Sequence, residues 1–304
     1  MIPEDWKVTK LGEVADVKTG PFGSALHEKD YVDDGTPIIT VEHLDEQGVI
    51  YANLPMVSDL DRKRLNAYSL IKGDIVFSRV GSVDRNSLIK EEEIGWLFSG
   101  RLLRIRLKTS DVYSPYLSYY FNQESTKQRI RAVAVGQTMA SLNTQILKNI
   151  DIAFPTTKSE QIAIATILSD IDALIVSLDS LIAKKRDIKQ ATMQQLLIGK
   201  MRLPGFSEEW QSFNMANNST LKARIGWQGL TTAEYLKEGE YYLVTGTDFI
   251  DGQIAWDTCH FVDAKRYDQD KNIQLRVGDV LLTKDGLIGK VAYINHLPNG
   301  STLN

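Results

Sequence analysis

Two basic residues flank a glycine in the segment KGDIVFSRVGSVDR, in a position to contact a polyanion. Arg79 precedes Gly81 and Arg85 follows it. A guanidinium carries several N–H donors in one plane and can bind a phosphate or a guanine edge through two hydrogen bonds. The alternative is a hairpin whose arginines pair with carboxylates of the same fold. We favour contact with nucleic acid because the arrangement recurs, with Lys284 and Lys290 around a second glycine.

Two polar loops supply further candidates for such contacts. Lys18 precedes the segment TGPFGS, whose backbone amides suit a phosphate oxygen. Gln137 and Thr138 lie in GQTMASLN, a loop that could contact base edges or phosphates. Ordinary turn chemistry is the alternative for both loops, and the first loop is not repeated later in the chain.

Motifs for catalysis are missing. The sequence has no Pro-Pro dipeptide, which the adenine-methyltransferase motif requires, and no Pro-Asp, phosphate-loop or dinucleotide-binding motif. Its four histidines lie far apart, and the single cysteine, Cys259, excludes a cysteine-rich zinc site. We therefore expect no catalytic residue, no metal site and no cofactor. A nuclease or methyltransferase with a cryptic active site is the alternative.

The overall charge of −4 conceals a strong asymmetry along the chain. Residues 1–61 hold 4 Lys/Arg against 13 Asp/Glu, a net of −9, whereas residues 62–149 hold 15 against 7, a net of +8. The second segment could neutralise phosphates. The N-terminus is polar, and no unbroken apolar run reaches the roughly 18–20 residues that span a bilayer. We expect a cytoplasmic protein without membrane contact.

An internal repeat organises these candidates. Trp6 recurs as Trp210 and Gly48 as Gly252, a shift of 204 residues, and after a one-residue slip KGDIVFSRVGSVDR matches VGDVLLTKDGLIGK. In each copy a short β-rich run follows a Gly-Asp turn, at 75–77 and at 280–282. The basic residue at 79 or 284 should then lie at the end of a strand, beside a turn.

Between the copies the sequence predicts one long helix from Ser159, its expected cap, to about Gly199. Apolar residues recur every three or four positions from Ile164 to Ile188 without proline or glycine. Such a helix would be roughly 60 Å long, and its apolar side needs a second helix. We expect that partner interface to be centred on Ile171, Leu174, Leu178 and Leu181. The alternative is a long helix packed on its own domain.

The motifs in this order resemble those of a known family. They are PEDW at 3–6, KGDIVF at 72–77, IDIAFP at 150–155, SEQI at 159–162, QLLIGKMRLPGF at 195–206 and EW at 209–210. The arrangement resembles the DNA specificity subunit of type I restriction–modification systems, over essentially the whole chain.

The resemblance implies an α+β fold. A β-rich target-recognition domain would occupy 1–157, a coiled-coil-type spacer helix 158–202, and the N-terminal part of a second, incomplete β-rich recognition domain 203–304. A shift of 205 places Asn304 opposite Ser99, so we expect the second copy to be truncated.

The resemblance also implies the partners. These would be double-stranded DNA, the modification (methyltransferase) subunits and the restriction subunit, an ATP-dependent translocase and nuclease. Self-association through the spacer helix is a further possibility. Methylation and cleavage would belong to the partner subunits, and the function would be to direct the complex to a split target site. The non-DNA alternative is a coiled-coil adaptor between proteins.

Overall fold

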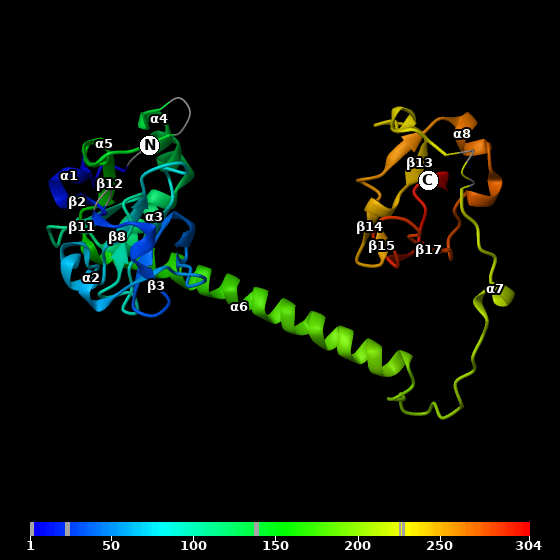
Figure 1. Ribbon diagram of the computed structural model, residues 1–304. Coiled ribbons are helices and arrows are strands. Elements are labelled where there is room, and N and C mark those ends of the chain that lie inside the picture. Colours follow the sequence, from blue (N-terminus) through cyan, green and yellow to red (C-terminus); the bar gives the residue numbers. More distant parts are fainter. Residues whose placement is uncertain (1–2, 22–24, 137–139, 225, 227–228) are drawn as a thin grey trace. The chain divides into compact units, whose positions relative to one another are not determined.

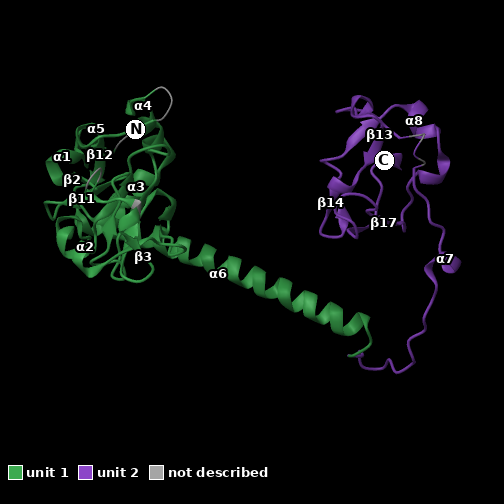
Figure 2. Ribbon diagram, viewed as in Figure 1, with its two compact units in different colours: residues 1–200 green, residues 201–304 purple. Residues whose placement is uncertain are grey.

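The computed structural model describes residues 3–21, 25–136, 140–224, 226 and 229–304. The chain forms two compact units, residues 1–200 (unit 1) and residues 201–304 (unit 2) (Figures 1 and 2). The division into 1–157, 158–202 and 203–304 remains a prediction, whereas the α+β class is confirmed.

Unit 1 is built on two four-stranded sheets. The first has the order β2 (Ala15–Thr19), β11 (Leu102–Leu107), β8 (Ile75–Ser78), β9 (Asn86–Leu88), and all its neighbours are antiparallel. The second has the order β10 (Leu97–Phe98), β4 (Thr36–Ile39), β7 (Met56–Val57), β3 (Tyr31–Val32). All four residues of β8 are buried, so this strand lies in the middle of the fold.

Short elements surround these sheets. Two more strand pairs are β1 (Trp6–Lys10) with β12 (Asp151–Pro155) and β5 (Leu44–Asp45) with β6 (Gly48–Val49). The helices are α1 (Leu11–Val14), α2 (Asp59–Arg64), α3 (Ser114–Asn122), α4 (Glu124–Val133) and α5 (Thr144–Lys148), with 3-10 turns at Glu28–Asp30, Val41–His43 and Asn66–Tyr68. Helix α3 packs on β8 and β9, where Phe77 and Phe121 meet edge to face with centroids 5.3 Å apart.

The predicted long helix is present as α6 (Lys158–Leu197), which at about 1.5 Å per residue is roughly 60 Å long. The expected cap at Ser159 is wrong, because the helix already includes Lys158 and follows Thr157. Only Gln161 and Ala165 of α6 are buried. The Gln161 side chain donates to the carbonyls of Asp111 and Pro155 and accepts from the Tyr113 amide, each at 2.8 Å. These bonds attach the first turn to unit 1.

By length and composition α6 could cross a membrane, since one 18-residue window has a mean hydropathy of 1.7. The prediction of no membrane contact was based on unbroken apolar runs alone and did not include this window. Asp170 and Asp172 interrupt the apolar half of the helix, and a charge at a bilayer centre costs roughly 2.5–3.5 kcal/mol. This composition favours a protein partner over lipid.

Unit 2 repeats part of this arrangement. Its elements are a three-stranded sheet β16 (His260–Val262), β13 (Tyr241–Val244), β19 (Ser301–Leu303), the pairs β14 (Phe249–Ile250) with β15 (Gln253–Ile254) and β17 (Val280–Leu282) with β18 (Val291–Tyr293), the helices α7 (Met215–Asn218) and α8 (Ala264–Asp268), and 3-10 turns at Thr232–Glu234, Gly246–Asp248 and Lys271–Ile273. A small core of buried apolar residues lies between them.

The internal repeat is confirmed at the level of strand register, with a constant shift of 205 from β4 onward. Ile38 pairs with Leu97 as Leu243 pairs with Thr302, and Ile75 pairs with Leu88 as Val280 pairs with Tyr293. The expected match of Gly48 with Gly252 is wrong, because Leu44 pairs with Val49 as Phe249 pairs with Ile254. Gly252 therefore lies in the hairpin turn, whereas Gly48 begins a strand. Gly252 has a φ of +80° and Gly48 a φ of +140°, and both values favour glycine. The shared glycine in the sequence therefore does not mean that the two residues are structural counterparts.

Candidate nucleic-acid interface

The turn between β8 and β9 is closed in the same way as its counterpart in unit 2. The Ser78 amide donates to the Arg85 carbonyl at 2.8 Å, and the Ser78 hydroxyl accepts from the Arg85 amide at 3.1 Å. In unit 2 Thr283 makes the same two bonds with Lys290, each at 3.0 Å. A side chain that bonds across the turn holds both hairpins in one shape, and the predicted positions of Arg79 and Lys284 just after a strand are confirmed.

In unit 1 two other segments converge on this turn. The Arg79 amide donates to the Arg101 carbonyl at 2.9 Å, and the Gly81 amide donates to the Ala140 carbonyl at 2.9 Å. Arg79 in turn accepts from the Leu142 amide at 2.8 Å. The loop that carries Gln137 and Thr138 is thus joined to the turn, although these two candidates lie outside the described residues.

The two arginines of the turn have separate surroundings. Arg79 is partly buried, and its Nη1 donates to the Gly100 carbonyl at 3.1 Å. Arg85 donates to the Leu44 carbonyl and lines a hollow of about 190 Å³ together with Glu46 and Lys127, which form an ion pair. The hairpin alone therefore does not bring the two guanidinium groups onto one ligand.

Lys18 lies on β2, at the far side of the same sheet from β9. Its ammonium donates to the Ala67 carbonyl at 2.7 Å and lies 4.5 Å from the centre of the Tyr68 ring. No contact joins it to Arg79 within the part of the chain that the structure describes. Lys18 would have to act at a separate point of the interface.

Sequence reasoning did not select Arg101 or Arg131, which the structure brings to the turn. Arg101 is exposed and bonded through its backbone to Arg79, while Arg131 forms ion pairs with Asp84 of the turn, at 3.0 Å, and with Glu124. Both arginines are distant in sequence from residues 79–84. The pairing of β8 with β11 brings Arg101 to this turn, and no local sequence pattern indicates that pairing. For Arg131 there was a signal, since it lies close in sequence to the candidate loop at 136–143.

In unit 2 the turn candidates are more open. Lys284 has a side chain 62% exposed and lies 3.9 Å from Asp285, too far for a strong ion pair in water. Lys290 is partly exposed, and its backbone closes the turn. Among the described residues of unit 2, no buried partner of these two side chains is found that would hold them away from a ligand.

Nothing among the described residues forms a metal site or a nucleophilic site. No group of three or more His, Cys, Asp or Glu side chains converges there. Burial, reinforced by Asp248, raises the pKa of the Cys259 thiol to about 12, so this cysteine is a poor nucleophile at neutral pH.

Comparison with known proteins identifies the family. Residues 3–186 match the model of the type I restriction modification DNA specificity domain. The chain belongs to this family.

Two relatives from Methanocaldococcus jannaschii show how much of a specificity subunit the chain covers. It is 30% identical to the putative type I restriction enzyme MjaX specificity subunit, over 84% of this chain and 61% of the relative. It is 27% identical to the MjaVIII specificity subunit, over 66% of this chain and 48% of the relative. The chain thus spans about half the length of these relatives.

A solved structure agrees with the fold. The type I restriction–modification S subunit from M. genitalium aligns with 99% of this chain and 71% of its own length, with a TM-score of 0.51 and 17% sequence identity. At this identity the likeness concerns the fold alone.

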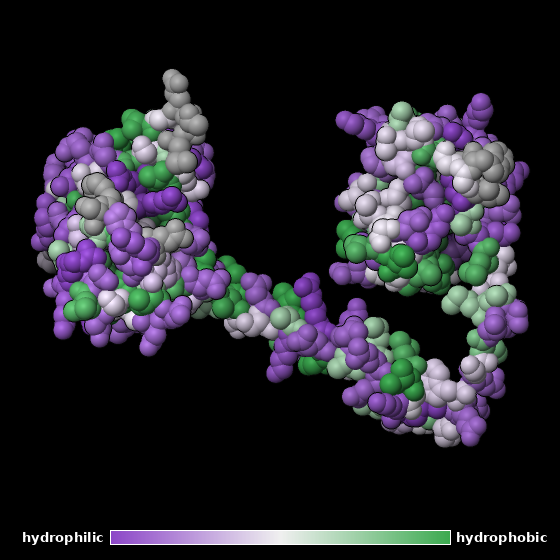
Figure 3. Space-filling model, viewed as in Figure 1, coloured by the Kyte–Doolittle hydropathy of each residue, from purple (hydrophilic) through white to green (hydrophobic). Residues whose placement is uncertain are grey.

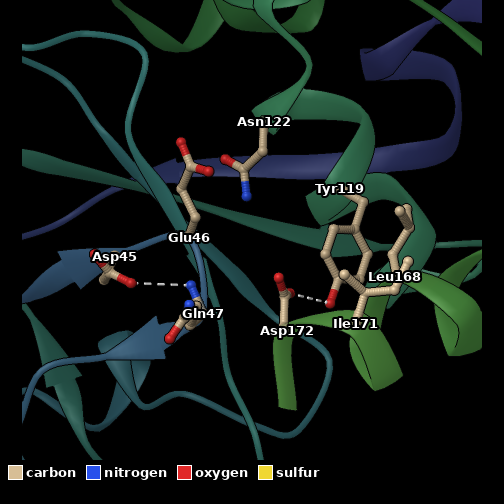
Figure 4. A pocket seen from close by; sticks show the side chains of 8 residues that line it. All are labelled: Asp45, Glu46, Gln47, Tyr119, Asn122, Leu168, Ile171 and Asp172. Atoms are coloured by element: carbon tan, nitrogen blue, oxygen red, sulfur yellow. Dashed lines mark hydrogen bonds between the residues drawn. The ribbon is translucent and has the colours of Figure 1, made fainter. Parts of the chain in front are cut away.

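In this specificity-family chain a second hollow, of about 350 Å³, lies where α6 leaves the rest of unit 1 (Figure 4). The residues that line it come from the β5–β6 hairpin, from α3 and from α6, and they are Asp45, Glu46, Gln47, Tyr119, Asn122, Leu168, Ile171 and Asp172. Its three carboxylates do not suit a phosphate. The Tyr119 hydroxyl donates to Asp172 at 2.6 Å, and burial together with this bond raises the pKa of Tyr119 to about 12. The phenol therefore keeps its proton at neutral pH and ties α6 to α3.

The expected partner interface on α6 begins at this junction, where Ile171 also lines the hollow, and continues along the helix. Ile171, Leu174, Leu178 and Leu181 are each about half exposed. Isoleucine and leucine side chains recur along one side of the helix, and the rest of unit 1 does not cover them. We call this side, from Ile171 to Leu181, the stripe; it is available to another helix.

Tyr119→Phe should loosen the attachment of α6. A hydrogen bond of this kind contributes about 1 kcal/mol, so amides of α6 near Asp172 should exchange with solvent roughly fivefold faster by hydrogen–deuterium exchange. The raised pKa also predicts that the tie is complete below pH 10 and is lost as the pH rises through about 12.

Tyr120→Phe is the matched control, because the Tyr120 hydroxyl bonds to Arg129 and to the Asp151 carbonyl rather than to α6. Equal exchange rates in the two variants would show that the Tyr119 bond does not hold the helix.

Proposed function

We propose that the chain is a sequence-specific DNA-binding subunit that directs a type I restriction–modification complex to a split target site. The observation that carries this proposal is the repeated hairpin. The same closed turn, with a basic residue one or two positions after the strand, occurs in both units, and a long helix lies between the two turns in the sequence. Two DNA-binding hairpins of the same structure suit a DNA target site whose two halves are separated.

The rigidity of the turn supports this function. A side chain that reads a base edge must be held by its own fold, because ordering it on binding costs free energy. Arg79 begins from a turn with hydrogen bonds to two other segments, which fixes the backbone that carries it. The Nη1 bond to the Gly100 carbonyl also helps to fix the position of the guanidinium.

A protein adaptor is the second candidate. The long helix alone would serve an adaptor equally well, but the repeated basic turns have no evident purpose in one. The family model describes a DNA specificity domain, which also favours DNA. We infer that methyl transfer and cleavage are carried out by the modification and restriction subunits in the cytoplasm, and that α6 binds the modification subunits.

The full chain should bind duplex DNA with an affinity that falls steeply with salt, because each neutralised phosphate contributes about −0.9 to the slope of log K against log salt concentration. Arg79→Ala should weaken binding to the specific site by about 1–3 kcal/mol if the guanidinium reads a base. If it contacts phosphate instead, all sequences should weaken alike and the slope should fall by about one. Fluorescence anisotropy over a salt series measures both quantities.

Lys72→Ala removes one positive charge from the opposite end of β8, where Lys72 pairs with Glu91, and serves as the control for net charge. Identical affinities of the Arg79 and Lys72 variants for specific and random duplexes would exclude Arg79 from the interface. Salt-independent binding would favour the adaptor.

The exposed stripe of α6 should mediate assembly. Leu178→Glu places a charge in the stripe, where it would be buried by a partner helix. The variant should abolish association with the methyltransferase subunit, or self-association, while unit 1 stays folded. Val176→Glu is a matched control, since Val176 is equally exposed, 49% against 48%, but lies two residues away and therefore on the opposite side of the helix. Analytical ultracentrifugation of the chain alone and with the methyltransferase measures the masses. A wild-type chain that stays monomeric in both samples would refute the role of the stripe.

A further inference from the structure

Arg101 lies between two of the sequence-predicted candidates, at one end of the first sheet of unit 1. It directly precedes β11, which is the strand between β2 and β8. Lys18 lies near the end of β2, and Arg79 follows the end of β8. Because β11 is antiparallel to both neighbours, its start lies beside the ends of both. Arg101 therefore occupies the middle position at this end of the sheet.

The turn that carries Arg101 is held by hydrogen bonds from β8 and within itself. Its carbonyl accepts from the Arg79 amide at 2.9 Å, and the Gly100 carbonyl accepts from the Arg79 Nη1 at 3.1 Å. The Leu102 amide donates to the Ser99 carbonyl at 3.0 Å and closes the turn. The backbone at Arg101 is therefore ordered before any ligand binds, so that binding does not have to order it.

The end of β2 packs so closely on this turn that it requires a glycine. The Gly20 amide donates to the Leu102 carbonyl at 3.1 Å, and a Cβ at Gly20 would lie 2.1 Å from the Ser99 carbonyl oxygen. Neighbouring strands lie about 4.8 Å apart, so the ends of β2, β11 and β8 span about 10 Å. Each strand of duplex DNA carries one phosphate per roughly 3.4 Å of helix axis. Basic side chains at this end of the sheet can therefore reach neighbouring phosphates of one duplex.

Among the described residues, Arg101 differs from the other basic residues near the turn because its side chain has no partner in the fold. Lys18 and Arg85 donate to backbone carbonyls, and Arg131 forms two ion pairs. The Arg101 side chain is exposed, and no hydrogen bond or ion pair to it is found in the part of the chain that the structure describes. Contact with DNA therefore breaks no existing bond of this side chain.

Exposure alone does not single out this arginine, because much of the face of unit 1 that Figure 3 shows is hydrophilic. Arg101 is distinguished by a fixed backbone, an exposed side chain and a position between Lys18 and Arg79. These three features together point to a ligand that extends along this end of the sheet.

We propose that Arg101 contacts a phosphate of the DNA backbone, between the contacts of Lys18 and Arg79. An exposed arginine suits a phosphate better than a base edge, because reading a base requires the side chain itself to be held in place. Phosphate contacts fix the register and the orientation of a protein on the duplex. Arg101 thereby orients the neighbouring turn toward the bases. The inference rests on the proposed DNA-binding function and adds a contact residue to it.

The test compares variants of the full chain on a duplex of random sequence, because a phosphate contact does not depend on sequence. Arg101→Ala should lower the affinity about two- to fivefold. It should also reduce the slope of log K against log salt concentration by about 0.9. Arg101→Lys should keep the wild-type slope, since lysine retains the positive charge. Fluorescence anisotropy over a salt series measures both quantities.

Lys108→Ala is the matched control, because Lys108 is also exposed and directly follows the other end of β11, roughly 20 Å along the strand. Its ammonium donates to the Gly12 carbonyl of α1, away from the turn. This variant removes the same charge and should leave the slope and the affinity unchanged. Both side chains are exposed, so neither variant should unfold unit 1, and circular dichroism checks this.

The outcomes separate this inference from the function on which it rests. A wild-type chain that does not bind duplex DNA would overturn both. If the wild type binds with a steep salt slope and Arg101→Ala matches Lys108→Ala in slope and affinity, the assignment of Arg101 alone is wrong. A reduced slope in Arg101→Lys would also overturn it, because the charge would then not be what the DNA contacts.

Discussion

Asp74 directly precedes strand β8, and its carboxylate accepts hydrogen bonds from the Ile71 amide and from Arg106 of β11. The group is buried, so its charge requires these partners. The ion pair fixes the start of β8 against β11, and the four buried residues that follow carry the chain to Arg79. The ion pair of Asp74, at the start of β8, thus helps to position Arg79 just after the end of the same strand. In unit 2 the corresponding carboxylate has the backbone bond, and the β17–β18 turn is nevertheless closed by the same hydroxyl bonds. The hairpin is therefore a self-contained element, while its burial depends on what lies beside it.

Local patterns in the sequence were sufficient to predict elements but not their environments. The spacing of isoleucine and leucine from Ile164 to Ile188 predicts α6 because helical periodicity is a property of neighbouring residues. The strands at 75–77 and 280–282 follow from Gly-Asp turns in the same way. The convergence of Arg101 on Arg79 depends on pairing between β8 and β11, which no local pattern encodes. The surroundings of Arg79 and Arg85 differ for the same reason, since each finds a carbonyl on a different distant segment.

The charge asymmetry of the sequence also overstates the positive surface. Several arginines and lysines of the basic segment 62–149 pair with acidic residues of 1–61, namely Arg64 with Asp61, Arg104 with Asp16 and Lys127 with Glu46. Arg104 is buried, so its guanidinium is not part of a DNA-facing surface, although its partner Asp16 is half exposed. Part of the positive charge of residues 62–149 is therefore neutralised by ion pairs with residues 1–61. A DNA interface built on this unit must therefore rest on a few well-placed side chains.

The junction of α6 with unit 1 connects the two proposed activities. Gln161 is fully buried and bonds to the backbone of Asp111, Tyr113 and Pro155, so three bonds orient the first turn of the helix. Eleven residues later, Asp172 binds Tyr119 of α3 and fixes the rotation of the helix about its axis. Two attachments three turns apart leave little freedom in the direction in which the stripe at Ile171–Leu181 faces. The same α3 packs on β8 and β9 beneath the turn that carries Arg79. A partner held on this side of α6 would therefore be oriented relative to the candidate DNA contacts through the packing of α6 on α3 and of α3 on the β8–β9 hairpin.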